Sequence, residues 1–120
     1  MITGIGLDIV ELNRIGNIVK RNPKFIDRIL TAGEKERFVQ LSAKRRLEFL
    51  AGRFAAKEAF SKAIGTGIGK KLSFLDIEIL NDEKGKPVLI QEKIKDKVHV
   101  TITHSQQFAV AQVIVERIES

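Results

Sequence analysis

Glu58 is the residue whose position most strongly suggests chemistry. Projected at about 100° per residue, the helix expected from residue 43 to residue 64 carries an apolar stripe, and Glu58 falls in the middle of its continuation. A buried carboxylate without a partner is costly, so Glu58 should be paired, protonated, bound to a metal ion or placed where the stripe opens into a cleft. Lys62 offers an ordinary alternative, because the two residues have the i, i+4 spacing of an ion pair on a solvated helix. The stripe consists of Leu47, Leu50, Ala51 and Phe54.

Asp8 is a second carboxylate in a suggestive place. It ends a glycine-rich strand in which Gly4 and Gly6 indicate close approach of another backbone or a ligand. Asp is also a good helix N-cap, and a helix is expected soon afterwards. Two carboxylates with vacant coordination positions suit Mg²⁺, which keeps water ligands and binds through one or two carboxylates plus substrate phosphates. The sequence alone does not bring Asp8 and Glu58 together.

Several other polar residues allow two interpretations. Arg53 and Lys57 lie on a helix face beside the stripe, where they either meet phosphates or are solvated. His104 and Ser105 follow a predicted strand, and a ligand contact suits them better than a hydrolytic triad, because no nucleophile elbow such as GxSxG is present. The glycine-rich segment 65–71 lacks the GxxxxGK[ST] spacing of a phosphate loop, so it predicts a turn with room for a ligand.

The elements that must position these residues predict an α+β fold with antiparallel strands. Apolar spacing, Pro23 and the glycines after residue 64 set most of the boundaries, and Thr31 with Glu34 has the spacing of a capping box. No repeat or linker divides the chain, so a single domain should span residues 1–120. The predicted strands are 2–10, 76–80, 87–90, 98–103 and 108–116, and the predicted helices are 12–22, 24–30, 31–41 and 43–64.

Composition restricts the chemistry and the partners. The chain has no cysteine, which excludes disulfides and thiolate ligands, so any metal ion must be held by oxygen or imidazole. No apolar run is long enough to span a bilayer and no signal peptide is recognisable, so a cytoplasmic protein without a membrane association is expected. The net charge is +6, and residues 12–46 hold ten Lys and Arg against three Asp and Glu. This excess predicts an acidic partner of some kind.

The last predicted strand is apolar on both faces. Either helices cover both faces, or helices cover one face and a neighbouring subunit covers the other, and the second arrangement is preferred. One face consists of Ala109, Ala111, Val113 and Val115, and the other carries Phe108, Val110 and Ile114.

Three segments together resemble the small bacterial holo-acyl-carrier-protein synthases: residues 4–11 (GIGLDIVE), 53–63 (RFAAKEAFSKA) and 100–105 (VTITHS). The resemblance extends over essentially the whole chain. It implies a 4′-phosphopantetheinyl transferase fold, in which a long central helix and shorter N-terminal helices pack on an antiparallel sheet. It also implies magnesium-dependent transfer of 4′-phosphopantetheine from coenzyme A to a serine of apo acyl carrier protein. The products are holo carrier protein and adenosine 3′,5′-bisphosphate, and the activity supports fatty acid biosynthesis.

The resemblance also implies roles for individual residues. Asp8, Glu58 and Lys62 are expected to be catalytic, with Asp8 and Glu58 holding Mg²⁺ against the diphosphate and Lys62 facing the phosphates. The base that accepts the serine proton is either Glu58 or a magnesium-bound water. The expected coenzyme A contacts are Arg45, Arg46, Arg53, Lys57, Ser61, Lys62, Gly65, His104 and Ser105.

The expected partners follow from the same resemblance. Family members are homotrimers with active sites between subunits, and the acidic carrier protein gives the basic stretch a specific partner. Nucleic acid is not expected, because the chain lacks Trp and Tyr for stacking and shows no recognition motif. A trimeric module that binds coenzyme A or carrier without turnover is the other alternative. The predicted carrier-docking residues are Arg14, Ile18, Arg21, Lys24, Phe25 and Arg28.

Overall fold

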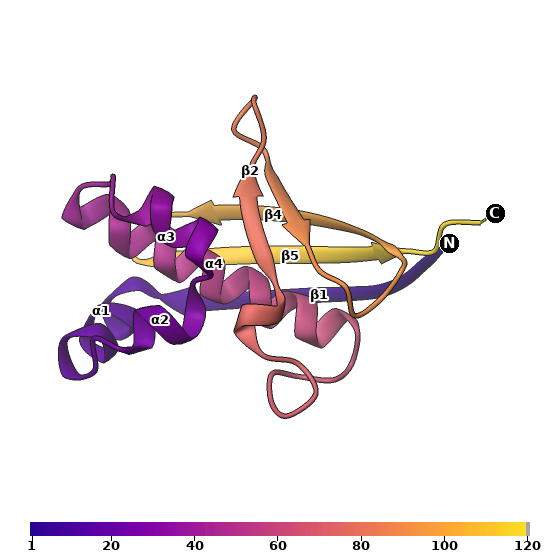
Figure 1. Cartoon of the computed structure of the whole chain (residues 1–120), viewed down its shortest axis with the longest axis horizontal. Helices are drawn as coiled ribbons and strands as arrows, with labels where there is room; N and C mark the ends of the chain where they lie inside the picture. Colours follow the sequence, from indigo (N-terminus) through magenta and orange to yellow (C-terminus); the bar gives the residue numbers. More distant parts are fainter. Residues whose placement is uncertain (120) are drawn as a thin grey trace.

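The computed structural model describes residues 1–119 as a mixture of helices and antiparallel strands (Figure 1). Helices α1, α2 and α3 gather at one end of the molecule, and the two termini lie side by side at the other end. The elements in chain order are β1 (Ile2–Glu11), α1 (Leu12–Arg21), α2 (Phe25–Ile29), α3 (Ala32–Phe38), α4 (Ala43–Ala63), the 3₁₀ turn η1 (Phe74–Asp76), β2 (Glu78–Asn81), β3 (Pro87–Ile90), β4 (Lys97–His104) and β5 (Phe108–Glu116).

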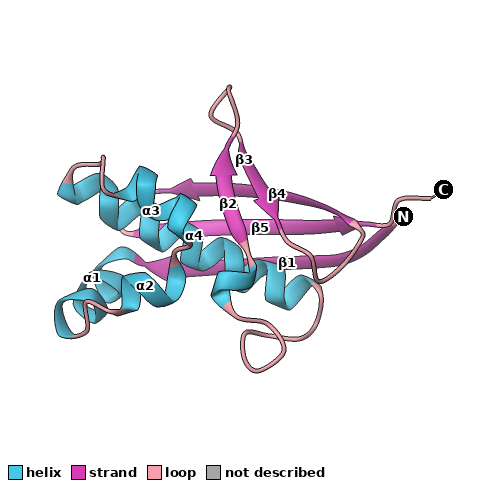
Figure 2. Ribbon diagram, viewed as in Figure 1, coloured by secondary structure: helices cyan, strands magenta, loops and turns pink. Residues whose placement is uncertain are grey.

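Two antiparallel ladders make up the β structure (Figure 2). The larger sheet has the order β1-β5-β4, so the first and last strands of the chain are hydrogen-bonded neighbours. In this sheet Asp8 is opposite Ala111 of β5, and Ala111 is in turn opposite Ile102 of β4. The smaller ladder is the β2–β3 hairpin. The α+β class and the long helix are therefore confirmed, with one local difference: Asp76 belongs to the turn η1 and not to a strand.

Helix α4 lies against the inner face of the larger sheet and also contacts α1, α2 and α3. Because neighbours cover it on several sides, its buried residues are not confined to one stripe, and Arg53 and Lys57 are among them. The alanines of α4 and of β5 form much of the contact, which allows helix and sheet to approach closely. Arg53 and Lys57 therefore need partners inside the protein, whereas the sequence allowed either phosphate contacts or solvation.

Glycines in β1 permit an especially close approach to α4. A Cβ atom at Gly6 would lie 1.8 Å from the carbonyl oxygen of Ala59, and one at Gly4 would lie 2.2 Å from that of Ala63. Both obstacles are helix backbone, which a side-chain movement cannot relieve. The glycines therefore determine the separation between β1 and the second half of α4.

Helix ends are fixed by caps that the sequence signals. Thr31 and Glu34 form the predicted capping box at the start of α3, and the Ser42 hydroxyl caps α4 by accepting from the backbone N–H of Arg45. Gly65 follows α4 with a φ of 81°, a conformation that favours glycine. Among the described helices, none combines the length and the apolar character needed to cross a membrane.

The outer face of the larger sheet carries exposed apolar side chains. Ile5, Leu7 and Ile9 of β1 are 62, 57 and 61% exposed, because they point away from α4. On β5 the same face carries Val110 and Ile114, which are paired with Ile9 and Ile5. The inner face of β5 is covered by α4, whereas this outer face has no covering helix within the described residues.

Candidate active site

Asp8, Glu58 and Lys62 come together where β1 meets the second half of α4. Asp8 lies within the strand on the face that looks toward α4, and its Oδ1 accepts a hydrogen bond from the Lys62 Nζ at 2.9 Å. The same ammonium donates to the carbonyl oxygen of Leu7 at 3.2 Å. Glu58 is half-buried one helical turn before Lys62. The alternative role for Asp8 as a helix cap is wrong, because α1 begins after Glu11 and has no side-chain cap.

The electrostatics of this group favour an additional positive charge. Burial raises the pKa of the Glu58 carboxyl, the negative charge of Asp8 raises it further, and the Lys62 ammonium lowers it. The pKa of Lys62 is raised, mainly by its hydrogen bond to Asp8. The carboxylates of Asp8 and Glu58 repel each other, and the exposed Lys62 ammonium lies beside them. A cation bound to the two carboxylates would therefore stabilise this group.

The donor set matches magnesium better than a metal held by protein ligands alone. Within residues 1–119 no cluster of three or more His, Cys, Asp or Glu side chains could enclose a metal ion. Asp8 and Glu58 leave most coordination positions to water or to a ligand, which is how Mg²⁺ is usually bound beside substrate phosphates. The residues present therefore fit the magnesium site expected from the sequence.

A basic pocket of about 260 Å³ lies on the other side of α4. Arg53 is nearly buried there: its guanidinium donates to the carbonyl oxygen of Ile79 and to Asn81 Oδ1, and it stacks 4.1 Å from the centre of the Phe49 ring. Burial lowers the pKa of Arg53 to about 10, which leaves the group cationic at neutral pH. The other polar residues lining the pocket include Arg37, Arg45, Glu48 and His104.

His104 and Ser105 lie at the rim of this region. The His104 Nδ1 is 3.6 Å from Glu48 Oε2, and the His104 side chain is 44% exposed. The Ser105 hydroxyl accepts hydrogen bonds from the backbone N–H groups of Gln107 and Phe108, and this fixes the turn between β4 and β5. The hydroxyl proton of Ser105 stays available to a ligand.

Three expected coenzyme A contacts are engaged elsewhere in the protein. Lys57 is fully buried and its ammonium binds Glu34 and the carbonyl oxygen of Ile29, so it does not face a phosphate. Ser61 is also fully buried, and its hydroxyl donates to the carbonyl oxygen of Glu58. The Arg46 guanidinium donates to the final carbonyl groups of α3. Because Lys57 and Ser61 are fully buried and bound within the protein, these two predicted contacts are corrected, whereas the contact from the half-buried Arg46 stays a prediction.

The pocket also contains polar residues that the sequence did not identify. Arg37 reaches the pocket from α3, a helix whose sequence carries no signal for ligand binding. Glu48 faces His104 across α4 and β4, and Asn81 holds Arg53 from the end of β2. Each of the three comes from a different element, so no local spacing connects them.

The carboxylate group and the basic pocket do not form one continuous site within this chain. Asp8 is on β1 and His104 is on β4, at opposite edges of the larger sheet. Adjacent strands lie about 4.8 Å apart, so two strand spacings and the body of α4 separate the groups. None of Asp8, Glu58 and Lys62 lines the pocket.

Comparisons with known proteins agree over nearly the whole length. The model of the 4′-phosphopantetheinyl transferase superfamily matches residues 4–113. The holo-[acyl-carrier-protein] synthase of Anoxybacillus flavithermus is 62% identical over 120 residues and all of both chains, and that of Bacillus subtilis is 58% identical over 121 residues, again covering both.

Solved structures show the same similarity in three dimensions. A holo-(acyl-carrier-protein) synthase from Bacillus anthracis in complex with CoA (3′,5′-ADP) matches with a TM-score of 0.93 at 56% identity, covering 98% of this chain and 99% of that one. The enzyme from Helicobacter pylori in complex with coenzyme A matches with a TM-score of 0.83 at 39% identity, covering 93% and 99%.

Proposed function

This chain belongs to the 4′-phosphopantetheinyl transferase superfamily, and we propose that it is a holo-acyl-carrier-protein synthase acting through Asp8, Glu58 and Lys62. It transfers 4′-phosphopantetheine from coenzyme A to a serine of apo acyl carrier protein. The serine oxygen forms a bond to the β-phosphorus, the bond from that phosphorus to the bridging oxygen breaks, and adenosine 3′,5′-bisphosphate leaves. The serine proton passes to a base. No covalent intermediate on the enzyme is needed.

The observation that carries this proposal is the meeting of Asp8, Glu58 and Lys62 at the β1–α4 contact in a chain with full-length similarity to these synthases. Phosphoryl transfer depends mainly on positioning and on neutralising charge around the phosphorus. Lys62 supplies a positive charge, held beside Asp8 and one turn from Glu58. Catalysis by Asp8, Glu58 and Lys62 therefore requires a cation bound to the two carboxylates.

We assign that role to magnesium, which would be held by Asp8 and Glu58. When bound, Mg²⁺ neutralises charge on the diphosphate of coenzyme A. Asp8 orients the Lys62 ammonium through the 2.9 Å hydrogen bond, and because the Leu7 carbonyl accepts a second N–H, one N–H remains for a phosphate oxygen. Glu58, whose pKa is raised by burial and by Asp8, is the candidate for the base among this chain's residues, and a bound magnesium ion would offer water as the alternative.

The basic pocket is the proposed site for the nucleotide end of coenzyme A. Arg45 and Arg53 present positive charge, and His104 with Ser105 adds hydrogen-bonding groups at the rim. Planar guanidinium groups bind phosphate oxygens through paired hydrogen bonds. Gly65, which is exposed at the end of α4 near Lys62, leaves space for the pantetheine arm.

A homotrimer would bring the Asp8 and Glu58 carboxylates of one subunit to the basic pocket of another. The carboxylate group and the basic pocket lie on opposite sides of α4, and the apolar outer sheet face next to Asp8 is available for a neighbouring copy. Burial of such a face is a strong drive for association. We therefore propose that the pocket of one subunit faces Asp8 and Glu58 of the next.

Complementation between two inactive variants tests this assembly. Asp8→Asn removes a carboxylate and Arg45→Glu reverses a charge in the pocket, and each homotrimer should be inactive. Co-expressed chains that form mixed trimers should regain activity, because some sites then combine an intact Asp8 with an intact Arg45. No recovery in verified mixed trimers would mean that both groups act within one chain.

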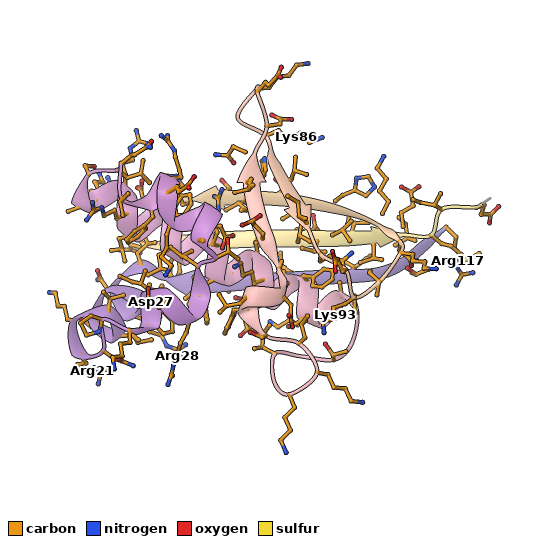
Figure 3. The ribbon with its side chains drawn as sticks, in the orientation of Figure 1. Arg21, Asp27, Arg28, Lys86, Lys93 and Arg117 are labelled. Atoms are coloured by element: carbon orange, nitrogen blue, oxygen red, sulfur yellow. The ribbon has the colours of Figure 1, made fainter. Side chains whose placement is uncertain are left out.

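The acidic carrier protein is proposed to bind at the basic surface of α1 and α2. The four basic residues of this surface are exposed, and the two apolar residues among them are half-buried. Figure 3 shows Arg21 and Arg28 extending away from the sheet toward solvent. We place the reaction in the cytoplasm, in support of fatty acid biosynthesis. The proposed docking surface consists of Arg14, Ile18, Arg21, Lys24, Phe25 and Arg28.

The test of the activity is release of adenosine 3′,5′-bisphosphate from coenzyme A in the presence of apo carrier protein. Release should require the carrier serine, so a carrier with that serine changed to alanine should give none. Glu58→Gln in the enzyme should also abolish release. A Glu58→Gln variant with normal turnover would exclude this carboxylate from the reaction.

A further inference from the structure

Lys57 is a buried cation next to Glu58 that the transfer mechanism does not use. Its side chain is fully buried, and its Nζ donates to the carbonyl oxygen of Ile29 at 2.6 Å and to Glu34 Oε1 at 2.7 Å. Burial lowers the pKa of Lys57, while the charge and hydrogen bond of Glu34 raise it. The Lys57 ammonium and the Glu34 carboxylate both lose their hydration here, so their stability depends on the hydrogen bonds that they make inside the protein.

Glu34 connects the ammonium to the start of α3 and to β2. Its Oε1 also accepts from the backbone N–H of Thr31 at 2.9 Å, which is half of the capping box of α3. Its Oε2 accepts from the backbone N–H of Ile79 in β2 at 2.8 Å. Lys57 and Glu34 together therefore tie the end of α2, the start of α3 and the strand β2 to helix α4.

The carbonyl group of Ile29 is the partner that links this network to a helix of the proposed docking surface. Ile29 is the last residue of α2, a helix of five residues. A helix this short is not stable by itself, so its placement depends on contacts with the rest of the protein. Lys57 provides such a contact at the C-terminal end of α2, where a positive charge also complements the helix dipole.

A second contact holds the other end of α2 to the same turn of α4. The ring of Phe25 lies 5.9 Å from that of Phe54, and Phe54 lies 5.4 Å from Phe74 in η1. Phe54 and Lys57 are three residues apart, so they lie on one side of α4. The first and last residues of α2 are thus both fixed to α4, while Arg28 between them points to solvent (Figure 3).

We propose that Lys57 and Glu34 form a positioning pair that holds α2 on α4 in the orientation in which its basic face receives the carrier protein. The pair acts on carrier recognition through α2, and touches neither coenzyme A nor the reacting atoms. This inference rests on the proposed function, because it uses the docking surface assigned above.

The test replaces both members so that no unpaired charge stays buried. In Glu34→Gln/Lys57→Met, glutamine keeps the side-chain acceptor of the capping box, and methionine keeps most of the volume of lysine without the ammonium. Changes in such a network typically alter the coupling free energy between the sites that it connects. The KM for apo carrier protein should therefore rise roughly 2- to 30-fold. The KM for coenzyme A and the kcat at saturating carrier should stay unchanged. Backbone amides of residues 25–30 should exchange hydrogen faster.

The matched control is the exposed ion pair that joins α3 to α2. Lys35 Nζ lies 2.8 Å from Asp27 Oδ1, with both side chains substantially exposed. Such pairs contribute little, so Asp27→Asn/Lys35→Met, which also keeps the net charge, should leave the carrier KM and the exchange of α2 near those of the unmodified protein.

An unchanged carrier KM with normal protection of residues 25–30 would overturn the proposal, as would a rise confined to the KM for coenzyme A. If the double variant does not fold, Glu34→Gln alone decides, because it removes the carboxylate that pairs with Lys57 and keeps the capping-box acceptor. It should raise the carrier KM in the same direction, and no rise would overturn the proposal. Hydrogen exchange needs neither substrate, so it still tests the pair if no carrier is modified and the proposed function fails.

Discussion

Replacing Gly6 with alanine should damage the carboxylate site without changing any of its side chains. The added Cβ would lie 1.8 Å from the carbonyl oxygen of Ala59 and 3.0 Å from the backbone nitrogen of Ala63. An ordinary contact is about 3.4 Å or longer, so β1 and α4 must separate by about 1.5 Å at this point. Asp8 lies two residues along the same face of β1, so it should move away from Lys62 and Glu58.

Two magnitudes follow from this displacement. Overpacking of a close-packed contact costs about 1–3 kcal/mol, which corresponds to a Tm lower by roughly 5–15 °C for a chain of this size. A catalytic group misplaced by about 1 Å can lose about 100-fold in rate, so kcat/KM for the transfer should fall by at least that factor. The activity loss should therefore greatly exceed the loss expected from the small unfolded fraction.

The assay compares Gly6→Ala with Gly69→Ala below the Tm of both variants. No atom lies within 4 Å of the point that a Cβ at Gly69 would occupy, and Gly69 has no positive φ, so alanine there should change neither Tm nor kcat/KM much. A folded Gly6→Ala protein with kcat/KM close to that of the unmodified enzyme would show that the β1–α4 separation does not set the site.

Three further predictions concern charge, assembly and docking. The pKa of Glu58 is raised in the folded protein, so the ionised carboxylate destabilises the fold at pH values above the ordinary pKa of the group. With metal removed by EDTA, Glu58→Gln should therefore raise the Tm at pH 7. This gain in Tm should shrink as the pH falls toward about 4.5. A lower Tm at pH 7 would contradict this sign. Leu7→Glu on the exposed sheet face should convert the proposed trimer to monomers in light scattering and remove activity, whereas Val39→Glu, at another exposed apolar residue, should not. A persistent Leu7→Glu trimer would exclude this face from the interface. Arg21→Glu should raise the carrier KM about tenfold at low salt and weaken its salt dependence, with coenzyme A KM unchanged, and an equal carrier KM at low salt would remove Arg21 from the docking surface.

The sequence predicted the elements well because local signals coincide with their boundaries. Thr31 and Glu34 mark the start of α3, and Pro87 and Phe108 begin strands where the alternation predicts them. Two local irregularities, a glycine-rich strand and a carboxylate on an apolar stripe, singled out Asp8 and Glu58 separately, and only the resemblance to the synthases grouped them. Their meeting depends on the antiparallel β1–β5 pairing and on the glycine contact with α4, and neither is visible in local spacing.

The roles of the basic residues on α4 were harder to predict, for a physical reason. The helical projection assumed one covered face, so Arg53 and Lys57 were expected to be solvated or to meet phosphates. In the fold, α2, α3 and β2 cover that side of α4, and the two cations bind carbonyl groups of Ile79 and Ile29, far away in sequence. The pocket residues Arg37 and Asn81 depend on the same tertiary contacts.

Phosphopantetheine transfer through the Asp8–Glu58 pair is tested most directly by intact-mass spectrometry of an apo acyl carrier protein incubated with this enzyme and coenzyme A, with magnesium and with EDTA. The carrier should gain the mass of one phosphopantetheine with magnesium, and none in EDTA or with Glu58→Gln. An unmodified carrier in the presence of magnesium would contradict the transfer activity, and equal modification in EDTA would contradict the role assigned to the two carboxylates.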